Sequence, residues 1–130
     1  MSGPALKFCG LTRADAIDAA VEAKADMIGF VFFPPSPRAL TPAAAGALAR
    51  RVAGRAACVG LFVAPDDAQI AATLAQVPLD WIQLHGDEPA ARIAAVKARF
   101  GLPVMRAIRV RMAEDLRDAP ALAETADRVL

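Results

Sequence analysis

The stretch LKFCGLTR (6–13) carries an amine and a thiol two residues apart, at Lys7 and Cys9. Side chains two apart on a β-strand point to the same face, so a strand here would direct both groups to one place. A nearby cation favours the thiolate form of cysteine. A thiolate can act as a general base or as a nucleophile. The alternative is that Cys9 is a small buried apolar residue, as most free cysteines are.

The only histidine of the chain, His85, ends the apolar run WIQLH (81–85). Gln83 lies two residues earlier and would share its face, so two polar side chains point the same way from an otherwise apolar strand. Buried polar groups need partners, and such a pair therefore indicates a site. The alternative is a hydrogen-bonded structural histidine.

Arg38 ends the loop PPSPR (34–38), which contains three prolines. Each proline fixes its own φ, so the loop should hold the guanidinium in place, where it can grip a carboxylate in a fork geometry. The alternative is an isolated surface arginine. Asp87 and Glu88 follow Gly86 and are interpreted as the N-cap and first-turn acids of a helix.

These candidates have to be positioned by regular elements, and the chain alternates between two periodicities. Segments between the apolar runs carry apolar residues three or four apart, which predicts helices, with a short helix within 113–126. Helix starts are predicted at Thr12 with Asp15, at Thr41–Pro42 and at Asp66 with Gln69, and helix ends at Gly54 and Gly101. The apolar runs predict strands at 5–9, 27–33, 57–63, 81–85, 103–110 and 127–130.

Repeated strand–helix units predict an α/β fold with a parallel sheet, in a single domain over 1–130. Two architectures fit: an open doubly wound sheet, or consecutive units of a (β/α)8 TIM barrel. No G-x-G-x-x-G follows the first strand, which disfavours the dinucleotide-binding open sheet. In both architectures the functional residues lie at the carboxyl ends of the strands, where Cys9, Arg38 and His85 are placed.

Composition excludes several classes of partner. The 15 basic and 14 acidic residues are interspersed, without a basic stripe, so no nucleic acid partner is expected. The longest apolar run, MIGFVFF (27–33), is far too short to span a membrane, and no secretory signal is visible. Cys9 and Cys58 fit neither a disulfide framework nor a metal-ligand spacing. We therefore expect a cytoplasmic protein with free thiols and no metal site.

Four motifs occur in an order and spacing that resembles the phosphoribosylanthranilate isomerase family: KFCGLTR, IGFVFFPPSPR, VGLFV and QLHGDE. The resemblance covers residues 6–130. It implies a (β/α)8 barrel that performs an Amadori rearrangement of N-(5′-phosphoribosyl)anthranilate in tryptophan biosynthesis, without a metal or organic cofactor. It also implies that Cys9 is the general base and that Arg38 and His85 hold the anthranilate part of this small phosphorylated substrate. Lys7 and Gln83 would support them.

The chain departs from the family pattern in length, since five strands and the start of a sixth are visible where a barrel needs eight. The resemblance places the general acid, an aspartate, just beyond residue 130. Asp127 starts the sixth strand and would lie at the wrong end of the barrel. We therefore expect an incomplete barrel that is inactive alone. The alternatives are an inactive half-barrel assembly module, or another phosphosugar barrel enzyme such as an epimerase or indole-glycerol-phosphate synthase.

Overall fold

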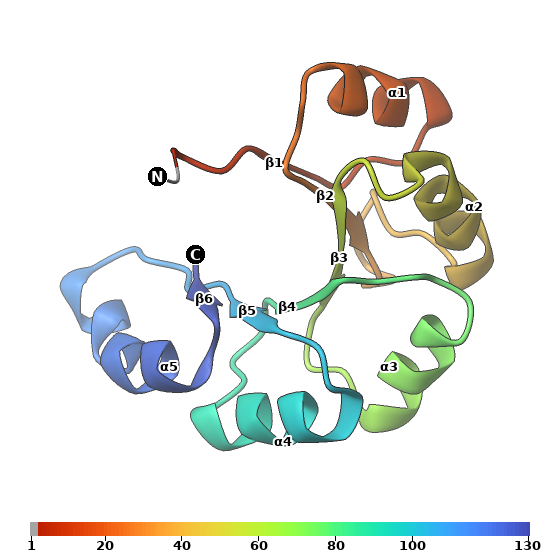
Figure 1. Ribbon diagram of the computed structural model, residues 1–130. Helices are drawn as coiled ribbons and strands as arrows, with labels where there is room; N and C mark the ends of the chain where they lie inside the picture. Colours follow the sequence, from red (N-terminus) through yellow and green to blue (C-terminus); the bar gives the residue numbers. More distant parts are fainter. Residues whose placement is uncertain (1–2) are drawn as a thin grey trace.

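The structure, a computed structural model, describes residues 3–130 and contains one sheet of six parallel strands in that range. The strands neighbour one another in chain order, and Figure 1 shows the sheet curling so that the helices lie on its outer side. The strands are β1 (Lys7–Cys9), β2 (Met27–Val31), β3 (Ala57–Phe62), β4 (Trp81–Leu84), β5 (Val104–Arg106) and β6 (Arg128–Val129).

A helix connects each strand to the next. An open doubly wound sheet would change direction in its strand order and carry helices on both faces, and neither feature is present here among residues 3–130. The prediction of an α/β fold with a parallel sheet is therefore confirmed, in its curled form. The helices are α1 (Ala14–Glu22), α2 (Pro42–Val52), α3 (Asp67–Leu74), α4 (Ala90–Phe100) and α5 (Ala119–Thr125), with a 3₁₀ turn, η1 (Ala113–Leu116), before α5.

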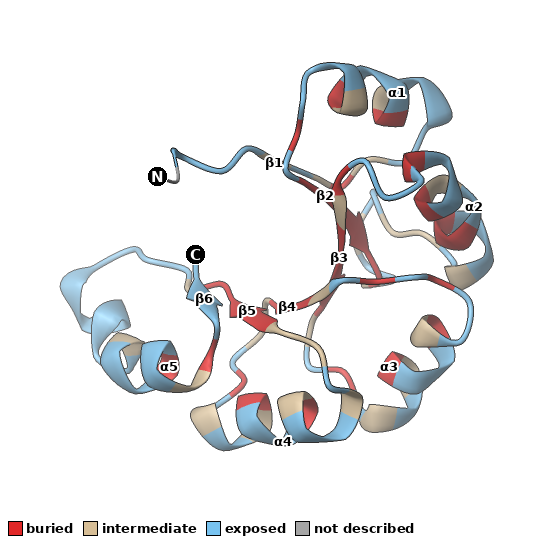
Figure 2. Cartoon of the chain, viewed as in Figure 1, coloured by how far each residue is buried: buried red, intermediate tan, exposed pale blue. Residues whose placement is uncertain are grey.

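Both faces of the central strands are buried, and the two faces pack against different partners. The outer face, with Phe30 and Ile82, packs against the helices in one large apolar cluster. The inner face holds a smaller cluster of Met27, Val59 and Met105. Figure 2 shows the buried residues concentrated on the strands and on the helix sides that face them. Burial on both faces explains why the strands lack polar alternation in the sequence.

Two of the three predicted helix starts are confirmed. The side chains of Thr41 and Asp66 each accept a hydrogen bond from the amide three residues later, at 3.2 and 2.7 Å. The capping box predicted at Thr12 is wrong, because α1 begins after Arg13 without a side-chain cap. Asp15 instead forms an ion pair with the Arg13 side chain at 2.6 Å. The Asp15 carboxylate thus binds the Arg13 side chain and does not form the reciprocal cap.

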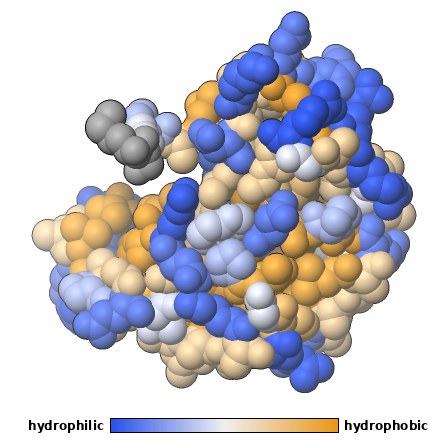
Figure 3. Space-filling view, in the orientation of Figure 1, coloured by the Kyte–Doolittle hydropathy of each residue, from blue (hydrophilic) through white to orange (hydrophobic). Residues whose placement is uncertain are grey.

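The helix ends and the last segment follow the prediction with small shifts. Gly101 ends α4 in the left-handed conformation, whereas Ala53 takes that position in α2 and Gly54 comes after it. The short helix predicted within 113–126 is present as η1 and α5. The segment leading into it exposes Val110 and Met112, and Figure 3 shows hydrophobic surface on the side where α5 lies. None of the helices in residues 3–130 combines the length and apolar character that a membrane crossing requires.

The strand predicted over 103–110 is shorter in the structure and ends at Arg106. Its last side chain is buried and donates hydrogen bonds to the carbonyls of Glu88 and Ala107. Ala107 still donates to the carbonyl of Leu84 at 3.0 Å, so the loop stays attached to β4. The apolar run alone did not show that the strand ends at the arginine inside it.

A repeated aspartate secures the amino-terminal edge of the sheet. An aspartate directly precedes each of the strands β2, β4 and β6. Its carboxylate accepts a hydrogen bond from a backbone amide that lies in the preceding strand or just before it. Each bond ties two neighbouring strands at the edge opposite to the expected site. The pairs are Asp26 with Leu6 at 2.7 Å, Asp80 with Cys58 at 2.8 Å, and Asp127 with Val104 at 2.9 Å.

Replacing Asp127 by asparagine is expected to reduce the stability of the fold at neutral pH. The Val104 amide, followed by Lys97, holds the pKa of the Asp127 carboxyl below its usual value. A depressed folded-state pKa stabilises the protein above the unfolded-state pKa of about 3.9, and this contribution disappears as the pH falls through the folded-state pKa. Urea unfolding of parent and variant from about pH 6 to about pH 2 should therefore show a stability difference that shrinks with acid. A difference independent of pH would contradict this role.

Candidate active site

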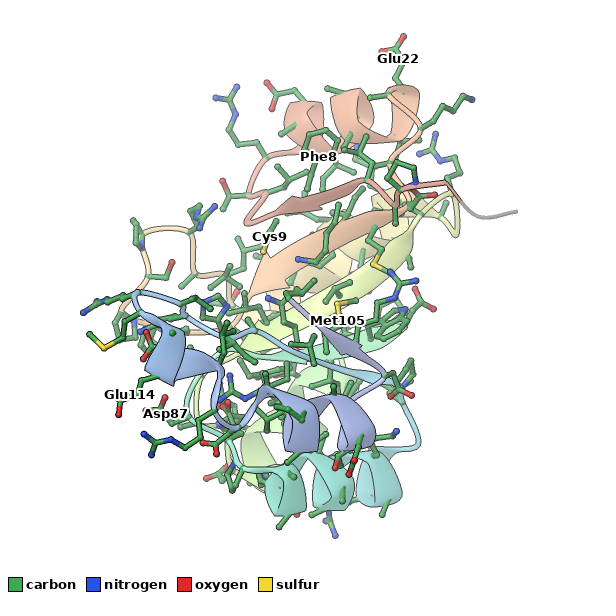
Figure 4. All side chains as sticks on the ribbon, turned by 90° about the vertical axis from the view of Figure 1, so that its left-hand side faces the viewer. Phe8, Cys9, Glu22, Asp87, Met105 and Glu114 are labelled. Atoms are coloured by element: carbon green, nitrogen blue, oxygen red, sulfur yellow. The ribbon has the colours of Figure 1, made fainter. Side chains whose placement is uncertain are left out.

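Lys7 and Cys9 share the inner face of β1, as the strand period predicted. Their neighbour on β2 is Gly29, which pairs with Cys9 in the parallel register. A Cβ atom at Gly29 would lie 3.0 Å from the sulfur of Cys9 and 3.4 Å from Nζ of Lys7. Figure 4 shows Cys9 and Phe8 on opposite sides of the strand, with Phe8 toward α1. The two reactive groups therefore lie together over a position that has room only because it is a glycine.

Arg38 packs against the backbone that follows the thiol. Its Nη1 donates a hydrogen bond to the carbonyl of Cys9 at 3.3 Å. A Cβ atom at Gly10 would lie 2.6 to 2.8 Å from the guanidinium, and Gly10 also has a φ of +77°. Both the space and the backbone conformation thus require glycine here. The C-G and S-P-R motifs are distant in the sequence but form one contact.

The loop that carries Arg38 is held by its own hydrogen bonds. The Ser36 hydroxyl accepts a bond from the Arg38 amide at 3.2 Å, and the Ser36 amide donates to the carbonyl of Phe33 at 2.9 Å. Ala39 then forms a parallel bridge with Val31 of β2. These contacts agree with the prediction that the proline-rich loop holds a defined conformation.

Gln83 and His85 point to the inner side of the sheet from the end of β4. The register pairs Gln83 with Met105, a residue of the inner cluster, and Nε2 of Gln83 lies 3.5 Å from Nδ1 of His85. When this amide donates, the ring proton is on Nε2, the nitrogen that faces away from Gln83. The amide oxygen of Gln83 is buried and has no hydrogen-bond donor among the described residues.

Several charges act on His85. Partial burial lowers the pKa of the imidazole, and the cations Arg109, Arg106 and Lys7 lower it further, while Glu88 opposes them. The ring is therefore largely neutral at pH 7, so one nitrogen donates a hydrogen bond and the other accepts one. The influence of Lys7 also places the β1 and β4 candidates in one electrostatic environment.

A pocket of about 670 Å³ opens beside His85, between the loops after β4 and β5 and the η1–α5 segment. Its lining includes His85, Arg106 and Arg109 together with acids such as Asp87 and Glu114. Figure 4 shows Asp87 and Glu114 at the same edge of the sheet as Cys9. Cys9 and Arg38 do not line this pocket.

The interpretation of Asp87 and Glu88 as helix-capping acids is wrong. Helix α4 begins at Ala90 with Pro89 as its N-cap, without a side-chain cap bond. The Glu88 side chain is buried, and its carboxylate accepts hydrogen bonds from two loop amides. Its cationic partner is Arg106, at 3.7 Å, a residue that the sequence pattern did not single out. The signal available in the sequence was the position of Arg106, a charged residue at the end of an apolar strand.

The second cysteine behaves differently from Cys9. Cys58 faces the helices, and burial followed by the nearby Asp80 raises the pKa of its thiol to about 11. It is therefore an unreactive thiol at neutral pH. Across residues 3–130, metal-binding side chains do not gather in groups of three or more.

The chain matches the family model described as N-(5′-phosphoribosyl)anthranilate (PRA) isomerase over residues 6–130. The N-(5′-phosphoribosyl)anthranilate isomerase of Paracoccus denitrificans is 59% identical over 111 residues, which cover 85% of this chain and 52% of that protein. The chain thus spans about half the length of the curated relatives that it matches.

Solved structures agree with the sequence match. The crystal structure of phosphoribosyl anthranilate isomerase from Thermotoga maritima is 29% identical, with a TM-score of 0.88, covering 97% of this chain and 62% of that one. A crystal structure of a phosphoribosyl anthranilate isomerase in complex with reduced 1-(o-carboxyphenylamino)-1-deoxyribulose 5-phosphate is also 29% identical, with a TM-score of 0.88, and covers 97% of this chain and 66% of that one. With a family model matched along almost its whole length, this chain belongs to the N-(5′-phosphoribosyl)anthranilate isomerase family.

Proposed function

We propose that residues 1–130 supply part of a (β/α)8 barrel domain that isomerises N-(5′-phosphoribosyl)anthranilate to 1-(2-carboxyphenylamino)-1-deoxyribulose 5-phosphate, in tryptophan biosynthesis. The observation that carries this proposal is the position of the Cys9 sulfur, on the inner face at the carboxyl end of β1. Active sites of such barrels lie at that end of the strands. Family membership gives the reaction its identity.

In the proposed mechanism, Cys9 is the general base. The sugar ring opens to a protonated Schiff base, and the Cys9 thiolate then removes the proton from C2′. The electron pair of that bond forms the enolamine double bond and neutralises the nitrogen. Tautomerisation returns a proton and leaves the ketone. Lys7, close to the thiol across Gly29, would stabilise the thiolate before it accepts the proton.

Arg38 and His85 would bind the anthranilate part of the substrate. The guanidinium can hold the carboxylate in a fork geometry, and its contacts with Gly10 and the Cys9 carbonyl keep it beside the base. The neutral imidazole can donate one hydrogen bond from Nε2. Gln83 would support His85, and its buried amide oxygen, which has no donor among residues 3–130, would accept a hydrogen bond from a donor of the bound complex.

The ring-opening step needs a general acid, and we assign that role to no residue among 3–130. Asp127 binds the Val104 amide and Lys97 at the amino-terminal edge, on the opposite side of the sheet from Cys9. The proposed ligand is a small phosphorylated molecule of the kind bound in the solved complex of the similar enzyme. The proposed location is the cytoplasm, where thiols such as Cys9 stay reduced.

A fusion tests the proposal directly. Residues 1–130 are joined to the part of the Paracoccus denitrificans relative that follows the position equivalent to residue 130, and loss of substrate fluorescence is followed. We expect turnover by the fusion and none by either part alone. The control is the same fusion with Cys9→Ala, which separates activity of this site from contamination. A folded fusion without turnover would refute the isomerase assignment and favour an assembly module.

A further inference from the structure

A buried ion pair ties together the loops that follow β3, β4 and β5. Glu88 is 5% exposed and Arg106 is 7% exposed, although both carry a charge. Burying charges is costly unless they are paired and hydrogen-bonded, so such a pair needs a reason. Neither residue was required by the proposed mechanism.

Each oxygen of the Glu88 carboxylate accepts a hydrogen bond from a backbone amide. One oxygen accepts from the Ala64 amide at 2.8 Å and the other from the Gly86 amide at 2.9 Å. Ala64 has a positive φ of 45°, a conformation that needs support in a residue with a side chain. A Cβ atom at Gly86 would lie 2.9 Å from the carboxylate, so this glycine is what lets Glu88 fold back on the loop.

Arg106 completes the cluster from β5. Its Nε donates to the backbone carbonyl of Glu88 at 3.0 Å and lies 3.7 Å from the carboxylate, while Nη1 donates to the carbonyl of Ala107. The guanidinium therefore binds both the side chain and the main chain of the β4 loop. Its rigid fork makes these contacts difficult for another side chain to reproduce.

We propose that Glu88 and Arg106 form a positioning pair that holds His85 in the geometry needed for substrate binding. His85 directly precedes Gly86, the residue that Glu88 binds, and its own amide is fixed to the carbonyl of Phe62 at 2.9 Å. The backbone of His85 is thus held on both sides. This inference rests on the proposed function, since only there does His85 bind the substrate.

The same pair also contributes to the charge environment of the imidazole. Burial and then Arg109 lower the pKa of His85 most; Arg106 and Lys7 also lower it, and Glu88 raises it. A purely structural pair elsewhere in the fold would leave the titration of His85 unchanged. Opposite effects of the two partners are therefore a signature of this arrangement.

His85 is the only histidine, so its NMR titration in the 130-residue chain reports on the pair without any substrate. We expect Glu88→Gln to lower the pKa of His85 and Arg106→Met to raise it, while Arg106→Lys leaves it close to the parent value. The matched control is Glu114→Gln. Glu114 lines the same pocket, but its side chain is 69% exposed, so this substitution should not shift the pKa of His85. Folding is checked by circular dichroism for each variant.

The inference is tested by substrate kinetics and by the titration of His85. In the active fusion, Glu88→Gln should lower kcat/KM by about tenfold to hundredfold, mainly through KM, as expected for a displaced binding group. If Glu88→Gln does not fold, the inference is tested by the pKa of His85 in Arg106→Met and Arg106→Lys. Shifts in the same direction, or no shift in folded variants, would overturn the pair. An inactive fusion with the expected shifts would instead count against the proposed function alone.

Discussion

Replacing Cys9 by alanine in the fusion is expected to lower turnover by about 100- to 10,000-fold, the range typical of losing a general base. The alanine removes the only thiol on the inner face of the described strands, beside Lys7 and Gly29. Cys9 is only partly buried, so the free energy of unfolding should change by about 0.5 kcal/mol or less. A large loss of activity with an unchanged fold is the combination that a base predicts.

The matched control is Cys58→Ala, which removes the other thiol. Because Cys58 is buried against the helices and has a raised pKa of about 11, its removal should affect stability more than turnover. Thiol labelling of the parent at neutral pH should modify Cys9 first, and labelling should abolish activity. A Cys9→Ala fusion that retains full turnover would eliminate the thiol from the mechanism, whatever the family.

The arrangement of Lys7 and Cys9 was predictable because it depends on the shortest range of information in a chain. Side chains on a strand alternate between two faces, so polar residues two positions apart are predicted to share a face without knowledge of the fold. The same rule placed Gln83 beside His85, and the alternation of strands and helices gave the parallel sheet. The strand order then follows if each strand lies beside the next one in the chain, which is the order that the structure shows.

The role of Glu88 was not predictable by the same means. An acid just before a helix resembles a cap, and the contacts that decide otherwise come from Ala64 and Arg106, which are 24 and 18 residues away in the sequence. Burial of a charge is a property of the assembled loops. Gly86 was the local signal, because a glycine two residues before an acid permits the chain to fold back on it. Arg106, ending an apolar strand, was the second.

The largest stability effect is expected at Phe62, near the carboxyl end of β3. Its side chain is fully buried and stacks on Phe32 with ring centroids 5.3 Å apart. Phe62→Ala removes this ring from the core and should lower the free energy of unfolding by about 3–5 kcal/mol. A domain of this kind has about 5–15 kcal/mol in total, so the variant would retain only part of its stability.

Phe62 also connects the core to the site, because its backbone carbonyl accepts the hydrogen bond from the His85 amide. Denaturant unfolding followed through Trp81, the only tryptophan, should give a lower midpoint for Phe62→Ala. The matched control is Phe8→Ala, since Phe8 is 37% exposed on the outer face of β1 and should cost about 1 kcal/mol. Equal costs at both positions would show that the two rings contribute alike, and that the stacked pair is not a centre of the core. A much larger cost at Phe62 would show that the stacked pair of rings is a centre of the core.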